Sequence, residues 1–196
     1  MQKLTVLAVC CSLLFVIHGQ KPRPCVAPPL FEGRLITMDP SKHFEFVARF
    51  SYDAFLKRER IIGKVFTAEN KTEILDTILL YRKRSMYSIF YHNKTCIKSP
   101  LTIPFRRAEI PHDATFIAQF VIGSSSLPGE GLLANSWTGE DKTQGGRYIM
   151  TATEFGCIPV SLLYNSNATG WSVTSYFDII NGIKDPEVFI PPEFCN

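Results

Sequence analysis

The stretch His43–Tyr52 (HFEFVARFSY) decides the fold class of this 196-residue chain. Its odd positions are mostly polar, whereas its even positions are aromatic or small: Phe44, Phe46, Ala48, Phe50 and Tyr52. An alternation with period two places the two kinds of side chain on opposite faces of a β-strand. The stretch therefore predicts a strand with one aromatic face and one mostly wet face.

Similar short runs of β-branched and aromatic residues follow, separated by turn residues. We expect strands within residues 60–67, 86–91, 116–122, 146–155 and 158–164. Many short strands at modest spacing predict a mainly β protein, built as an antiparallel sheet, a sandwich or an open barrel.

Two segments do not follow this pattern. Residues 73–81 (EILDTILLY) fit either one stripe of a helix or a buried strand. Residues 175–183 (SYFDIINGI) have apolar side chains at helical spacing and a glycine stop, which predicts a short helix.

The first 19 residues predict a secretory signal. A lysine precedes an uncharged apolar run at residues 4–17, which is too short to span a bilayer comfortably, and a small residue, Gly19, suits cleavage. No second long apolar run follows, so we expect residues 20–196 to form a single domain that is secreted or lies in the lysosomal lumen.

The cysteines and the glycosylation acceptors agree with this compartment. Cys10 and Cys11 leave with the signal, and the four that remain predict two disulfides with three possible connectivities. No C-x-x-C spacing occurs, which argues against a zinc or a redox site. Three N-x-T motifs predict surface glycans at Asn70, Asn93 and Asn167.

The sequence offers no support for catalysis or nucleic-acid binding. The net charge is only +3, and no run of five like charges occurs. No metalloprotease, nucleophile-elbow or phosphate-loop motif is present, and a turn explains the single His–acid neighbour pair, His112-Asp113. We therefore expect a protein that is not an enzyme and needs no cofactor.

The aromatic content indicates a different function. Fifteen Phe and seven Tyr either fill an aromatic-rich core or line a cavity for an apolar ligand. If a cavity exists, the alternation predicts six side chains that face it: Phe44, Phe46, Phe50, Phe116, Phe120 and Met150.

Motifs along nearly the whole length resemble the ependymin-related family of the mammalian type. They include Cys25-x-Ala27-Pro28, Ile78-Leu79-Leu80-Tyr81 and Gly156-Cys157-x-Pro159. The most specific is Gly182-Ile183-Lys184-Asp185-Pro186, which is followed by two prolines and Cys195.

This resemblance implies two antiparallel sheets that curve as a half-barrel around a deep hydrophobic pocket, similar to bacterial lipoprotein-carrier folds, with one or two short helices. It makes residues 73–81 a strand and pairs the cysteines as Cys25–Cys157 and Cys96–Cys195. It also implies a homodimer, lipid binding and calcium binding, without identifying the calcium ligands.

Two functions follow as hypotheses. The first is a non-catalytic carrier or sensor that binds a hydrophobic small molecule or lipid and contacts membrane surfaces transiently. The alternative is a calcium-dependent adhesion or matrix protein that acts through its glycans and its dimer surfaces.

Overall fold

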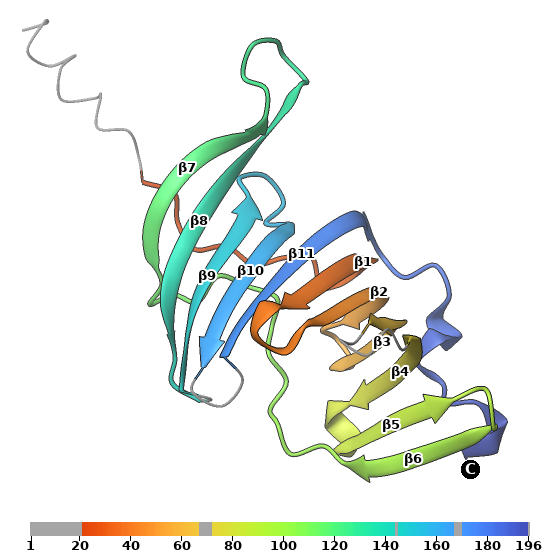
Figure 1. The fold of residues 1–196 in the computed structure, drawn as a ribbon. Coiled ribbons are helices and arrows are strands. Elements are labelled where there is room, and N and C mark those ends of the chain that lie inside the picture. The colour runs from red at the N-terminus through yellow and green to blue at the C-terminus, as the bar shows by residue number, and fades with distance from the viewer. Residues whose placement is uncertain (1–20, 67–71, 144, 167–169, 196) are drawn as a thin grey trace, which may run out of the picture.

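The structure, a computed structural model, describes residues 21–66, 72–143, 145–166 and 170–195. The expected signal and the acceptors Asn70 and Asn167 lie outside these residues. One antiparallel sheet contains all the strands, in the order β6-β5-β4-β3-β2-β1-β11-β10-β9-β8-β7 (Figure 1). The strands are β1 (Leu30–Asp39), β2 (Phe44–Asp53), β3 (Arg58–Phe66), β4 (Thr72–Leu80), β5 (Ser85–Phe90), β6 (Thr95–Pro100), β7 (Thr115–Gly123), β8 (Gly131–Asp141), β9 (Gly146–Thr153), β10 (Pro159–Ser166) and β11 (Gly170–Asn181).

The mainly β class is confirmed, and the fold differs from the prediction in its number of sheets. β1 to β6 and β7 to β11 form two series of consecutive antiparallel neighbours, which correspond to the two sheets that were expected. Because β11 pairs with β1 along seven residue pairs, the two series merge into one twisted open sheet (Figure 1). The helices among the described residues are short 3-10 turns: η1 (Pro40–Lys42), η2 (Tyr81–Lys83), η3 (Pro186–Phe189) and η4 (Glu193–Cys195).

The helix expected at residues 175–183 is wrong, because this segment belongs to β11 in the middle of the sheet. A β-bulge explains the error. Glu32 pairs with Ile180 and Arg34 with Phe177, so two residues of β11 lie opposite the single residue Gly33. The extra residue shifts the alternation by one position, and the apolar side chains then repeat at three-residue spacing. That spacing imitates one face of a helix.

The two faces of the sheet differ in character, and we name them from β1 and β2. The inner face carries Phe31, Leu35, Phe50 and Tyr52, all of them buried. The outer face carries the residues that alternate with these along each strand. On β4 it also carries Ile78, which is fully buried. The alternation in residues 43–52 therefore separates the two faces as the sequence predicts.

Each face is covered by an irregular segment. The crossover segment (residues 101–114) connects β6 to β7, and its Leu101 and Ile110 are buried. The C-terminal segment (residues 182–195) runs from β11 along β1–β4 to β6 (Figure 1). Phe189 in this segment is 2% exposed. No helix among the described residues has the length and apolarity needed to cross a membrane.

Candidate ligand-binding cavity

A cavity of about 700 Å³ lies on the inner face, between the sheet and the crossover segment. Both series of strands contribute to it, because β1 to β3 and β9 to β11 all place side chains in its wall. The apolar part of the wall includes Phe31, Leu35, Phe50, Ile61, Phe105, Met150 and Leu162.

The crossover segment is held in place by the N-terminal chain. Cys25 forms a disulfide with Cys157, next to the turn between β9 and β10. Backbone hydrogen bonds from Ala27 N to the Ala108 carbonyl (2.8 Å) and from Ile110 N to the Cys25 carbonyl (2.9 Å) then join the two segments. These contacts link residues that are far apart in the sequence, so they fix the wall of the cavity opposite the sheet.

Aromatic rings form the part of the wall nearest β1 and β2. The Phe31 ring centroid lies 4.7 Å from that of Tyr52 and 5.7 Å from that of Phe50. Phe105 of the crossover segment stacks on Tyr52 at 5.6 Å, and Tyr176 of β11 meets Phe50 edge-on at 5.7 Å. Offset and edge-on pairs of this kind fix the ring positions, which gives the cavity a preformed apolar surface.

A carboxyl group lies within this aromatic wall. Burial raises the pKa of Glu59 to about 7, against a hydrogen bond from Tyr81 that favours the charged form. Burial also raises the pKa of Tyr176 to about 12 and that of Tyr81 further still, so both tyrosines stay neutral. Near neutral pH the cavity therefore contains one carboxyl that can exist in either state, among neutral hydroxyls.

The opposite end of the cavity is polar. Arg106 binds both carboxylate oxygens of Asp141, at 2.6 and 2.9 Å, and the Tyr164 hydroxyl donates to Asp141 at 3.2 Å. The Tyr148 hydroxyl lies in the same region, buried and without a hydrogen-bond partner among the described residues. A buried hydroxyl without a partner is unfavourable, and this one lies against Gly139 of β8, closed off from the cavity.

The structure brings only some of the predicted cavity residues together. Phe50 and Met150 line the cavity. Phe44 and Phe46 pack in the neighbouring core, with ring centroids 6.4 Å apart. Phe116 packs edge-on against Trp137. Phe120 is 40% exposed on β7, outside the cavity wall.

Several cavity residues were not found from the sequence. Tyr52 belonged to the aromatic face of the predicted strand, and this alternation was the signal that could have added it. Tyr176 was hidden by the bulge in β11. Glu59 and Phe105 had no signal, because only the crossover of a distant segment brings Phe105 to the wall.

Comparisons with known proteins identify the family. A family model described as Ependymin matches residues 69–195. Mammalian ependymin-related protein 1 from Mus musculus is 33% identical over 95% of this chain and 83% of its own length. The chain belongs to the ependymin family. Ependymin-2 from Carassius auratus is 28% identical to this ependymin-family chain over 98% of the chain and 89% of its own length.

A solved structure shares the fold of this family member. An uncharacterized conserved protein from Thermus thermophilus aligns with a TM-score of 0.55, at 10% identity over 94% of this chain and 95% of its own. A LolA superfamily protein from Nitrosomonas europaea covers 89% of the chain and 92% of its own at 11% identity, but its TM-score is only 0.29. The first likeness concerns the fold alone, and the second is too weak to carry an argument.

Three other expectations concern features outside the cavity. The structure forms both disulfides that the family resemblance implies, Cys25–Cys157 and Cys96–Cys195. Asn93 is exposed in the turn between β5 and β6, as a glycan acceptor must be. In the part of the chain that the structure describes, no three His, Cys, Asp or Glu side chains come together as a metal site, so calcium binding stays a prediction.

Proposed function

We propose that this ependymin-family protein is a secreted, non-catalytic glycoprotein that binds a hydrophobic small molecule or a lipid in the inner cavity. The observation that carries this proposal is the cavity of about 700 Å³ between an aromatic sheet face and the crossover segment. Its volume lies within the range of about 300–1,000 Å³ that is typical of small-molecule sites.

The chemistry of the wall supports an amphiphilic ligand. Apolar surface removed from water on binding contributes about 25 cal/mol per Å². The apolar part of the ligand would lie against Phe31, Phe50 and Leu162. A polar group at its other end would meet the ion pair between Arg106 and Asp141.

Filling the cavity tests this proposal. Leu162 on β10 lines the cavity from the inner face, so Leu162→Trp would place an indole ring in the space that the ligand needs. We expect the affinity for a fluorescent fatty-acid probe to fall at least about tenfold, while native mass spectrometry no longer detects co-purified lipid. Leu56→Trp, in the exposed turn between β2 and β3, makes the same change outside the cavity.

The control should keep wild-type binding, and far-UV circular dichroism should show that both variants are folded. A folded Leu162→Trp protein that binds the probe as tightly as the wild type would contradict the proposal.

One observation supports a dimer contact, which the adhesion hypothesis requires. The β7–β8 hairpin extends beyond the rest of the sheet (Figure 1) and exposes Phe120, Leu127 and Leu132, at 40%, 63% and 49%. An exposed apolar patch of this kind suits contact with a second copy. Sedimentation analysis of Leu127→Asp tests this proposal, since a dimer that forms there would become a monomer.

A further inference from the structure

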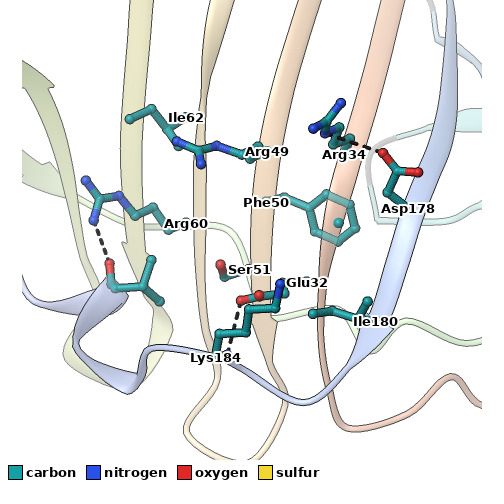
Figure 2. Close-up of a pocket in the computed structure, with 12 residues that line it drawn as sticks. Glu32, Arg34, Arg49, Phe50, Ser51, Arg60, Ile62, Asp178, Ile180 and Lys184 are labelled. Atoms are coloured by element: carbon teal, nitrogen blue, oxygen red, sulfur yellow. Dashed lines mark hydrogen bonds and ion pairs between the residues drawn. The ribbon is translucent and has the colours of Figure 1, made fainter.

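A second pocket, of about 600 Å³, lies on the outer face of β1, β2 and β3. Arg34, Arg49 and Arg60 come from three successive strands, and Lys184 comes from the C-terminal segment (Figure 2). Glu32 and Asp178 are the carboxylates in the same lining. The pocket therefore has more cationic than anionic side chains.

The apolar part of this pocket is small and lies at its edges. Ile62 on β3, Ile180 on β11 and Val188 of the C-terminal segment supply it. The bulge in β11 places Asp178 at one side, and the C-terminal segment bounds the other. This boundary is fixed, because the Lys184 backbone N–H donates to Glu32 and Cys195 is joined to Cys96.

Two of the three arginines already have anionic partners. Arg60 donates to both oxygens of Asp76, at 2.9 and 2.6 Å, and to the Val188 carbonyl at 2.8 Å, so its guanidinium is fixed. Arg34 has a single exposed ion pair, in which its Nε lies 3.4 Å from Asp178. This pair leaves the terminal nitrogens of Arg34 available to a ligand.

Arg49 has no such partner among the described residues. It is exposed and pairs directly with Arg34 across β1 and β2. Like charges directly opposite one another destabilise a sheet. The two side chains diverge accordingly, since Arg34 turns toward Asp178 while Arg49 reaches over Ile62 (Figure 2). Because both side chains are exposed, they can turn toward an anion bound between them, and its charge would offset this repulsion.

We propose that Arg34 and Arg49 form a binding site for a phosphate group on the outer face of the sheet. Two planar guanidiniums can donate to several phosphate oxygens at once, which a carboxylate with two oxygens matches less well. The small apolar edge formed by Ile62, Ile180 and Val188 would contact the body of the molecule that carries the phosphate. The site is separate from the inner cavity and does not depend on its proposed function.

Titration of the purified full chain with inorganic phosphate and with glycerol phosphate tests the site, by calorimetry and by thermal shift. We expect both ligands to bind and to raise the melting temperature. Arg49→Gln should weaken binding by about tenfold, the loss expected for a charge-assisted hydrogen bond. Without phosphate, Arg49→Gln should be at least as stable as the wild type, because the repulsion with Arg34 is gone.

Arg147→Gln provides the matched control. Arg147 is an exposed arginine on β9, outside the pocket, with Glu140 3.9 Å away. This variant loses the same charge, so it should keep wild-type affinity. Equal weakening by both variants would show general charge attraction and overturn the proposal.

A second arm distinguishes the source of the phosphate. Vesicles of phosphatidylcholine with phosphatidic acid are compared with vesicles of phosphatidylcholine alone. If soluble phosphate binds to the wild type and not to Arg49→Gln, the site takes a soluble ligand. If only the acidic vesicles bind, and their binding depends on Arg49, the site takes a lipid headgroup. Failure of every probe to bind through Arg49 overturns the proposal. Loss of the fatty-acid probe in Leu162→Trp reports only on the inner cavity.

Discussion

The two faces of β1–β3 are built from alternate residues of the same strands, yet they differ in almost every property. The inner face carries buried aromatic rings and encloses about 700 Å³ beneath the crossover segment. The outer face carries arginines around a pocket of about 600 Å³ beside the C-terminal segment. The Cys25–Cys157 disulfide anchors the N-terminal chain that holds the crossover segment, and Cys96–Cys195 attaches the C-terminal segment. One sheet can thus present two different sites because successive side chains point to opposite faces.

Removing the disulfides should have the largest effect on the unfolding free energy, and the two disulfides should affect the two faces differently. The bonds join residues 132 and 99 positions apart, and the chain-entropy model assigns loops of that size about 4–5 kcal/mol of unfolding free energy. We expect this loss in both Cys25→Ser/Cys157→Ser and Cys96→Ser/Cys195→Ser, as measured by urea unfolding. Only the first pair of substitutions should also weaken binding of the fatty-acid probe, since Cys25 holds the crossover segment. An equal loss of probe affinity in both variants would contradict this difference between the two disulfides.

Two aspartates on the outer face of the sheet should contribute unequally to the unfolding free energy. The Asp76 side chain is fully buried against Arg60, so Asp76→Asn leaves a buried charge and should cost about 3–5 kcal/mol of unfolding free energy. Asp178 forms an exposed pair with Arg34, and Asp178→Asn should cost less than about 1 kcal/mol. Asn also tolerates the positive φ of 52° at position 178. Urea unfolding of both variants checks this order, and equal costs would refute it.

Glu59 should give the inner face a pH dependence. Burial raises its pKa in the folded protein to about 7, from an ordinary value of 4.5. Between these values the folded state binds more protons than the unfolded state, so stability falls as pH rises and levels off above about 7. The full change is about 3 kcal/mol.

The variant Glu59→Gln should remove this slope and be more stable than the wild type above about pH 7. Urea unfolding across this pH range measures the effect, with the exposed Glu130→Gln as the control that keeps it. If Glu59→Gln retained the wild-type slope, another group would be responsible.

Features that depend on local periodicity in the sequence could be predicted. Residues 43–52 gave β2 and the inner aromatic face correctly, because period two is a local property of the sequence. The family resemblance supplied the disulfide pairing, which spacing alone left open. The bulge opposite Gly33 turned β11 into an apparent helix, since a shift of one residue destroys the alternation. Phe105 and Arg49 acquire their roles only through distant segments, so local patterns carried no signal for these two residues.

The substitution Tyr148→Phe should have a small effect on the unfolding free energy, but the sign of that effect is informative. Its hydroxyl is buried without a hydrogen-bond partner among the described residues. Tyr148→Phe should therefore raise the unfolding free energy of the ligand-free protein by about 1 kcal/mol. Tyr164→Phe makes the same change but removes the hydroxyl that donates to Asp141, so it should lower stability by a similar amount. Because the Tyr148 hydroxyl is closed off from the cavity, Tyr148→Phe should keep the wild-type affinity for the fatty-acid probe, and a severalfold loss of affinity would show that the hydroxyl contacts the ligand.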